Sequence, residues 1–309
     1  MQESIPVAYL SGQWVPFPNL RLPVYDLGIM QGATLTERLR TVRHKPYLVE
    51  QHLDRLQRGL KQVGLTIPES PPELAKIIDE LIERNRHLIP TDGDVAVVLF
   101  VTAGIAAGDA QGFAPAEPRP TVCVYTAPLA FAAWANWHAA GVSLVIPPVQ
   151  QVPSEVVSAS IKHRSRLHWY LADKLARETQ PGSMALLLDN HGCVTETSSG
   201  NLFVVQNGDV ITPTERATLP GISQQVVLDL CGEIGIPSRR ADLTPNDVTS
   251  ANEAFLTSST YCIVPVAALN GQPIGTAVPG PVTERLLAAW SDRIGVDIAG
   301  QARFMAGAS

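Results

Sequence analysis

Two continuous apolar runs limit the fold of this chain more than any other feature. DVAVVLFVTAG and PTVCVYTAP suit the central strands of a sheet. Two amphipathic segments precede them, QHLDRLQRGLKQVGL and PPELAKIIDELIERNRHL, with leucine or isoleucine at spacings of three and four. That spacing predicts two helices, each packed along one side. With the strand TLTERLRTV (Thr34 to Val42) before the helices, the first part of the chain is predicted to be an α+β domain.

The second part of the chain also mixes strands and helices. MALLLDNHGCVTE and NLFVVQNGDVITP are predicted hairpins, the latter turning at Asn207-Gly208. SEVVSASIK is predicted as a strand, and EAFLTSSTYCIVPV as a strand broken by a Ser-Ser-Thr turn. ISQQVVLDLCGEIGI is a predicted helix. RLHWYLADKLARE is another, with one apolar stripe made by Leu167, Tyr170, Leu171 and Leu175.

Between these parts, the segment from Pro128 to about His138 is low in charge and has no strong period. It either connects two domains or forms a short buried helix. We therefore expect a small N-terminal domain over residues 1–127, a connector over 128–138 and a larger C-terminal domain over 139–309.

Bulk composition excludes several kinds of partner. With 309 residues, 45% hydrophobic and 17% charged, the chain is typical of a well-filled globular protein. A net charge of −6 argues against nucleic acid or an anionic membrane as the main partner. The N-terminus lacks a signal-peptide pattern, and no apolar stretch reaches the roughly 18 residues of a membrane span, so we expect a cytoplasmic protein. The cysteines lack CxxC spacing and are expected to be buried reduced thiols, without disulfides or a metal site: Cys123, Cys193, Cys231 and Cys262.

Lys162, in ASIKHRSRL, is the first candidate for chemistry. On the predicted strand, period two places Lys162 on one face with the small residues Ser158 and Ser160. Small neighbours leave room for a ligand. The residue is either a surface charge at a strand end or a positioned amine able to form a Schiff base, which requires partial desolvation and a lowered pKa.

Other polar residues of the second part are likewise either solvated surface groups or ligand-binding groups. Glu196, in VTETSSGNLF, either is a solvated turn residue or pairs with a cation or a protonated ring nitrogen. In LPGISQQVV, the hydroxyl of Ser223 and the first amides of a helix form either a phosphate site or an ordinary N-cap. Ser259 and Thr260, in TSSTY, could serve the same anion.

Three arginines remain to be placed. Arg55 lies on the flank of a leucine stripe, which by pattern alone indicates a solvated position. Thr36, Arg38 and Arg40 share one face of their strand, opposite Glu37 and Leu39. Two arginines side by side are unfavourable unless an anion lies between them.

The order and spacing of these segments resemble the class IV aminotransferase family, which is pyridoxal-phosphate dependent and of fold-type IV. The resemblance runs from about Ala8 to Val266, and its anchors are DLGIMQGATLTERLRT, EQHLDRL, ASIKHRSRL, ALLLDNHGCVTETSSGNLF, LPGISQQVV and FLTSSTYCIVPV. It implies an α+β fold of two domains, a small N-terminal α/β sandwich and a larger C-terminal β-barrel-like domain with helices. It also implies a homodimer.

The resemblance implies a role for each matching residue. Lys162 looks like the lysine that forms the Schiff base with pyridoxal 5'-phosphate and moves the substrate proton. Glu196 looks like the partner of the pyridine nitrogen, with Asn201 as a supporting residue. Arg55 looks like the phosphate-binding arginine, so the flank of its helix would face the cofactor rather than water. The rest of the phosphate site would come from the backbone of Ile222, from Ser223 and from Ser259.

The sequence departs from the family where the substrate carboxylate is usually held. Ala103 replaces the arginine of D-amino-acid transaminases, and Leu167 the tyrosine of branched-chain enzymes. We therefore expect Arg38 or Arg40 to bind that carboxylate, with Thr36 and Thr260 as further substrate-binding candidates.

The resemblance favours a transaminase that moves an amino group from an amino acid to a 2-oxo acid. The alternative is a lyase of the aminodeoxychorismate type that eliminates pyruvate with the same lysine. KHRSRL resembles the lyase version of this segment in its Lys-His start and in Arg166.

Overall fold

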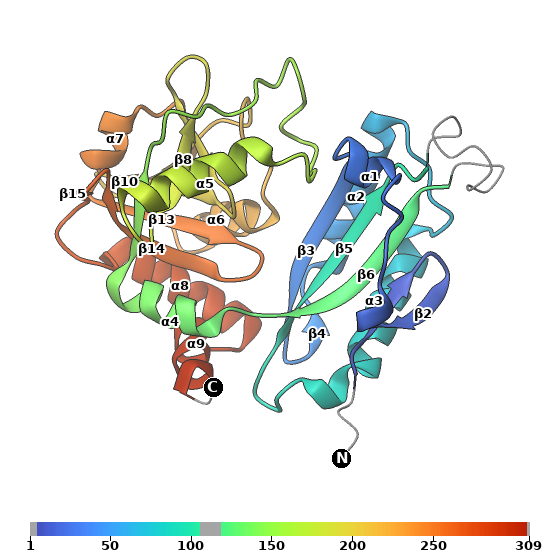
Figure 1. Cartoon of the computed structure of the whole chain (residues 1–309). Helices are drawn as coiled ribbons and strands as arrows, with labels where there is room; N and C mark the ends of the chain where they lie inside the picture. Colours follow the sequence, from blue (N-terminus) through green and yellow to red (C-terminus); the bar gives the residue numbers. More distant parts are fainter. Residues whose placement is uncertain (1–4, 106–118, 308–309) are drawn as a thin grey trace. The chain divides into compact units, whose positions relative to one another are not determined.

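The computed structural model describes residues 5–105 and 119–307, and Figure 1 shows their helices and strands, many of them labelled. Contacts divide the chain into two compact units. The first comprises Met1–Leu129 with Ile161–Arg166, and the second comprises Ala130–Ser160 with Leu167–Ser309. The segment around Lys162 is thus grouped with the first unit, whereas the boundaries at 127 and 139 remain predictions.

The first unit is built on an antiparallel sheet in the order β2-β1-β6-β5-β3-β4. Its strands are β1 (Val7–Leu10), β2 (Gln13–Pro16), β3 (Thr34–Val42), β4 (Lys45–Pro46), β5 (Val95–Thr102) and β6 (Thr121–Pro128). Its helices are η1 (Phe17–Asn19), α1 (Leu27–Met30), α2 (Val49–Val63), α3 (Pro71–Arg84) and η2 (Arg86–Leu88). The predicted strands and the two long helices of this part are confirmed.

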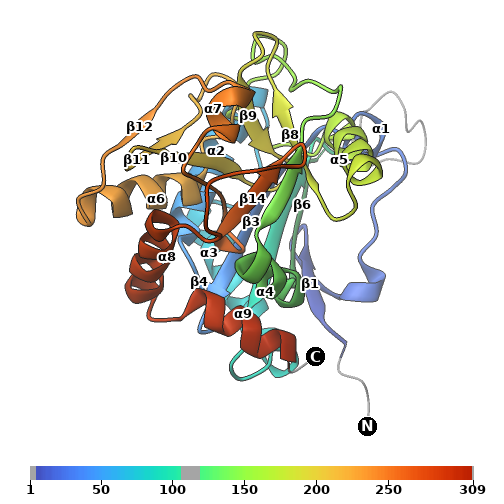
Figure 2. The same ribbon diagram turned by 90° about the vertical axis from the view of Figure 1, so that its left-hand side faces the viewer.

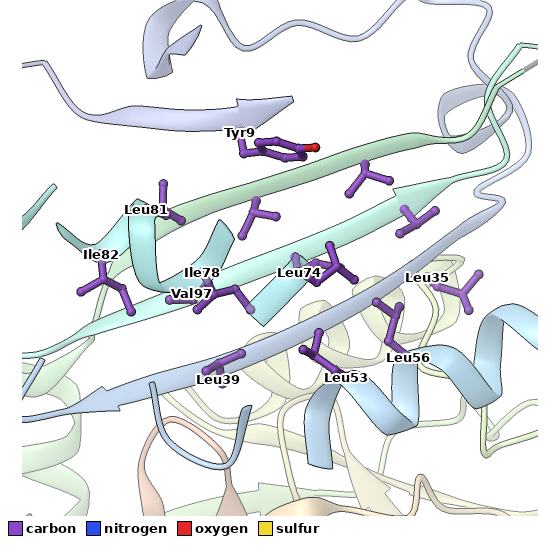
Figure 3. Packing of buried hydrophobic residues seen from close by; sticks show 14 of the residues in the cluster. Tyr9, Leu35, Leu39, Leu53, Leu56, Leu74, Ile78, Leu81, Ile82 and Val97 are labelled. Atoms are coloured by element: carbon purple, nitrogen blue, oxygen red, sulfur yellow. The ribbon is translucent and has the colours of Figure 1, made fainter. Parts of the chain in front are cut away.

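The core of the first unit lies between one face of this sheet and helices α2 and α3, as Figure 3 shows. Leu35 and Leu39 of β3 point to the same face because side chains alternate along a strand. They meet Leu53 and Leu56, which share one side of α2. Each fully buried leucine stabilises the fold by roughly 2 kcal/mol relative to an exposed one. The leucine spacing in the sequence therefore reports a real buried face.

The second unit contains a closed ring of six strands. The order β10-β13-β14-β7-β8-β9 returns to its start because β9 also pairs with β10, and β12, β11 and β15 extend the sheet. The predicted barrel-like domain is thus confirmed. Its strands are β7 (Val142–Val145), β8 (Met184–Leu188), β9 (Val194–Thr197), β10 (Asn201–Gln206), β11 (Asp209–Thr212), β12 (Ser238–Arg240), β13 (Glu253–Ser258), β14 (Cys262–Leu269) and β15 (Gln272–Pro273).

Helices surround this ring, and α4 packs against α9 near the C-terminus, as Figure 2 shows. The segment expected to be either a connector or a short buried helix forms α4, in which Phe131, Trp134 and His138 are buried. The C-terminal helices α8 and α9 and the short α7 were not predicted. The helices are α4 (Phe131–Ala140), α5 (Leu167–Thr179), α6 (Ile222–Glu233), α7 (Pro245–Thr249), α8 (Pro281–Ile294) and α9 (Ile298–Gly307).

The apolar stripe predicted for α5 is wrong. Leu167, Tyr170 and Leu171 are 71%, 64% and 44% exposed. The buried face instead carries Trp169, Ala172 and Ala176, beside β8. Small alanines allow a helix to approach a sheet closely, and a count of large apolar residues misses them.

A second correction concerns SEVVSASIK, which contains turns and bends but no strand. The period-two argument for Lys162 therefore does not hold, although the residue is half-buried. The four cysteines are free, and Cys193 is less buried than the other three. Within residues 5–105 and 119–307, no helix has the length and apolar character needed to cross a membrane.

Candidate functional site

Backbone hydrogen bonds hold the segment of Lys162 against β3. The amide of Thr36 donates to the carbonyl oxygen of Lys162 at 2.8 Å, and the amide of Arg164 donates to the carbonyl of Thr34 at 3.0 Å. Between them, His163 and Leu35 form an isolated antiparallel bridge. The position of Lys162 is thus fixed by pairing with β3, even though the segment is not a regular strand.

Arg55 lies at the centre of a buried charged cluster in the same unit. Its Nε and Nη2 donate to the two oxygens of Glu37, at 2.8 and 2.7 Å, and it is only 5% exposed. His52 Nδ1 lies 2.7 Å from Oε2 of Glu37. The solvated position predicted for Arg55 from the leucine pattern is wrong, because α2 packs so that this flank meets the carboxylate of β3.

The charges of this cluster are strongly perturbed. Burial by itself would raise the pKa of Glu37, but the ion pair and hydrogen bond with Arg55, helped by His52, lower it to about 2. Burial lowers the pKa of His52, and the charges of Arg55 and Lys162 lower it further against the opposing effect of Glu37. An ionised Glu37 therefore fixes Arg55, next to an imidazole that resists protonation.

The structure separates the two arginines of β3. Arg40 is 2% exposed, its Nε donates to the carbonyl of Thr41 at 3.0 Å, and its Nη2 lies 3.6 Å from the buried carboxylate of Asp94. Arg38 is exposed. The hydroxyl of Thr36 donates to the carbonyl of Leu99 at 3.0 Å. Arg40 thus serves a buried ion pair, and Arg38 is the arginine of this strand that can meet a ligand.

Glu196, in the second unit, is held as a hydrogen-bond acceptor. Asn201 Nδ2 donates to its Oε2 at 3.1 Å, and the amide of Leu219 donates to its Oε1 at 3.2 Å. Gln151 Nε2 lies 3.5 Å from Oε1. The same Asn201 amide donates to the carbonyl of Leu219 at 3.0 Å. These donors fix the direction of the carboxylate.

The N-terminus of α6 lies beside Asn201, one of the donors to Glu196. Gly221 is the N-cap, and Ile222 and Ser223 are the first helical residues, so the N-cap role considered for Ser223 is wrong. Ser223 is 4% exposed. A Cβ atom at Gly221 would collide with Oδ1 of Asn201, so only glycine allows this approach. The helix end therefore supplies amides and a hydroxyl suited to an anion.

The turn between β13 and β14 carries the remaining candidates. Ser259 and Thr260 are half-buried, and the hydroxyl of Thr260 lies 3.3 Å from that of Ser258. Helix α6 packs against β13, so the two candidate anion-binding segments lie on neighbouring elements of the second unit.

Each unit thus brings part of the predicted set together. The first holds Lys162, Arg55, Thr36, Arg38 and Arg40, and the second holds Glu196, Asn201, Ile222, Ser223, Ser259 and Thr260. Sequence reasoning missed Glu37 and His52. Glu37 lies on the same face of its strand as Leu35 and Leu39. A carboxylate on this apolar face was a signal that a buried cation must face it.

Comparisons with known proteins show the family and the fold of this chain. The sequence family described as Amino-transferase class IV matches residues 34–269. The D-alanine aminotransferase of Bacillus licheniformis is 28% identical, over 92% of this chain and 95% of that protein. The T.th. branched-chain amino acid aminotransferase superposes with a TM-score of 0.82 at 23% identity, over 95% of this chain and 96% of that one. The Escherichia coli enzyme of the same name gives 0.80 at 23% identity, over 93% and 94%.

Proposed function

Since this chain belongs to the class IV aminotransferase family and is an aminotransferase, we propose that it moves an amino group from an amino acid to a 2-oxo acid and uses pyridoxal 5'-phosphate as its cofactor. Two structures of the T.th. enzyme support the chemistry, one with pyridoxamine 5'-phosphate and one with 4-methylvaleric acid. The cofactor, when bound, supplies a sink for the electron pair left on the substrate Cα when its proton departs.

The setting of Glu196 is the observation that carries this proposal. A carboxylate that accepts hydrogen bonds from Asn201 and from the amide of Leu219 is held in a fixed direction. Such a group suits a protonated pyridine nitrogen, whose positive charge it stabilises. The chemical groups present therefore fit the cofactor: a lysine, a fixed carboxylate, a buried arginine and a helix N-terminus.

The other residues take the following roles in the proposal. Lys162 would hold the cofactor through Nζ and would move the proton between Cα of the substrate and C4′ of the cofactor. Arg55 binds the phosphate group, and Glu37 sets the direction of its guanidinium. The amide of Ile222 and the hydroxyls of Ser223 and Ser259 complete the phosphate site.

Covalent labelling tests the lysine directly. Borohydride treatment of the protein with pyridoxal 5'-phosphate should fix the cofactor on Lys162, as read by peptide mass spectrometry. Without borohydride, adding an amino acid should bleach the visible band of the bound cofactor. Labelling of a different lysine, or a band that no amino acid changes, would contradict the proposal. Lys174, an exposed lysine of α5, is the control and should remain unlabelled.

An assay of pyruvate release by the same protein distinguishes the transaminase from the lyase. Pyruvate released from aminodeoxychorismate without an added 2-oxo acid would indicate the lyase, whereas a strict need for an acceptor would indicate the transaminase. The relatives compared above carry aminotransferase names, which favours the second result.

We also propose that the chain forms a homodimer. The exposed apolar side chains of Leu167, Tyr170 and Leu171 make one face of α5 costly to leave in water. Light scattering should give twice the chain mass of 33.2 kDa, and a monomer at micromolar concentration would overturn this part of the proposal. The cytoplasmic location expected from the sequence remains a prediction.

A further inference from the structure

One face of the sheet in the first unit is turned away from the leucine core. Arg38 of β3 is paired with Val98 of β5, and Val98 with Tyr125 of β6. In the next row of that face, Thr36 is paired with Phe100. Paired residues project to the same side of a sheet, so Arg38, Phe100 and Tyr125 share this face.

The segment of Lys162 adds a second arginine to this face. The Arg164 backbone amide is fixed by its hydrogen bond to Thr34, and Cζ of its guanidinium lies 5.8 Å from the ring centroid of Phe100. The ring of Phe100 is in turn 6.4 Å from that of Tyr125, edge to face. Arg164 therefore lies over an aromatic floor, at a distance typical of cation–π contact.

The two guanidinium groups influence each other. Partial burial lowers the pKa of Arg38, Tyr125 opposes this effect, and the positive charge of Arg164 lowers it further. Both groups nevertheless stay charged at neutral pH, because a guanidinium is not deprotonated in proteins. Two cations thus repel each other beside apolar rings.

Neither of these cations has an acidic partner in residues 5–105 and 119–307. Arg40 and Arg55 of the same unit each contact a buried carboxylate, whereas Arg38 and Arg164 take part in no ion pair with any described residue. A bound anion would relieve the repulsion and give each guanidinium a charged acceptor. A carboxylate matches the planar fork of an arginine and is present on every amino acid and every 2-oxo acid.

We propose that Arg38 and Arg164 together bind a carboxylate of the substrate, and that this pair makes the enzyme select amino acids and 2-oxo acids over uncharged amines. The inference rests on the proposed function, because it takes Lys162, in the same short segment as Arg164, as the reacting amine. The carboxylate is either the one on Cα or the second carboxylate of a dicarboxylic substrate, and the test below separates these sources.

The test compares Arg38→Gln and Arg164→Gln with Arg58→Gln, which changes an exposed arginine of α2 in the same unit. Calorimetry on the holoenzyme measures affinity for 4-methylvalerate and for glutarate, neither of which can donate an amino group. Kinetics measure the conversion of a monocarboxylic amino acid, a dicarboxylic amino acid and an uncharged primary amine. Arg38→Lys keeps the charge but loses the planar fork, so it should recover part of the affinity.

Each glutamine substitution should weaken carboxylate binding and raise KM for amino acids by roughly 10- to 100-fold, as expected when a charged hydrogen bond is lost. kcat should change little, turnover of the amine should be unaffected, and Arg58→Gln should match the wild type. A loss with both classes of amino acid assigns the pair to the carboxylate on Cα. A loss confined to dicarboxylic ligands assigns it to the second carboxylate.

Two results would overturn the inference: carboxylate affinities equal to wild type in both variants, or an equal loss for the uncharged amine. Failure of the proposed function is distinguishable. In that case the wild type converts none of the amines, while calorimetry of the wild type and the variants still decides whether the arginine pair binds carboxylates.

Discussion

One edge of the Arg55 guanidinium is bound by a single carboxylate: Nε lies 2.8 Å from Oε1 of Glu37, and Nη2 lies 2.7 Å from Oε2. Glu37 belongs to β3 and Arg55 to α2, so two elements of the core hold the guanidinium in one orientation. A ligand of Arg55 then meets a group that is already positioned, and binding costs less conformational entropy.

Removing the charge of Glu37 should destabilise the protein strongly. In Glu37→Gln, Arg55 stays buried without its counter-charge, which is predicted to cost roughly 3–5 kcal/mol of unfolding free energy. Urea unfolding of the protein without cofactor, followed by circular dichroism, measures the loss. Glu50→Gln changes an exposed glutamate of the same helix as Arg55 and should shift stability by less than about 0.5 kcal/mol. Equal midpoints for the two variants would refute the structural importance of the ion pair.

Arg40 should matter for stability and not for substrate binding. Arg40→Met leaves the buried carboxylate of Asp94 without its cation, with an expected cost of about 3 kcal/mol. KM for amino acids should stay within about a factor of two of the wild type, because Arg40 is buried in its ion pair. A twofold change corresponds to less than about 0.5 kcal/mol. Steady-state kinetics and urea unfolding of one preparation give both values. A raised KM at unchanged stability would restore Arg40 as a substrate-binding residue.

Alanine at two glycines of the α6 region should weaken cofactor binding in one case and stabilise the fold in the other. In Gly221→Ala the new methyl group would press on Oδ1 of Asn201, so Asn201 must shift and Glu196 loses a donor. We expect the affinity for pyridoxal 5'-phosphate, measured by fluorescence titration, to fall about tenfold, which corresponds to the loss of one hydrogen bond. Gly232→Ala, where a Cβ meets open space within the helix, should instead stabilise the protein by about 0.5–1 kcal/mol. Unchanged cofactor affinity in Gly221→Ala would show that the helix end tolerates the methyl group.

Stability should fall as the pH is lowered from 6.5 to 4, partly because of His138 in α4. Burial, with a smaller effect from Arg303 and against that of Asp297, lowers the pKa of His138 from 6.5 to about 4. In this window the unfolded chain binds a proton that the folded chain does not, so unfolding becomes easier as the pH falls, by at most about 3 kcal/mol. His138→Gln should lose stability less steeply than the wild type over the same range, and the exposed-site variant His191→Gln should follow the wild type. Parallel curves for all three proteins would contradict this assignment.

Periodic patterns predicted those elements whose packing uses large apolar residues. Leu53, Leu56 and Leu60 of α2 are buried as their spacing indicates. The hairpin at Asn207-Gly208 follows from two residues that tolerate positive φ, at 52° and 89°. Both signals are local, so a single sequence contains them.

The pattern failed where packing depends on a partner far along the chain. In α5 the buried residues include Ala172 and Ala176, which are chosen for close approach and not for hydrophobic area. The position of Lys162 depends on hydrogen bonds to β3, more than a hundred residues earlier in the sequence. Likewise, the wheel of α2 could not reveal that Arg55 faces Glu37. Only the family resemblance predicted that Arg55 faces the cofactor rather than water, and it did not identify the carboxylate that holds the guanidinium.

The ring of strands in the second unit is completed by a single pairing of β9 with β10, and the two residues opposite each other there are Glu196 and Asn201. The pairing that closes the barrel and the hydrogen bond that holds the Glu196 carboxylate therefore involve the same two residues. In a molecule whose β9 has not paired with β10, Glu196 is not in position, so formation of the cofactor site depends on completion of the barrel. Amide exchange at Thr197, whose N–H donates to the carbonyl oxygen of Gly200, would report how often the pairing of β9 with β10 opens.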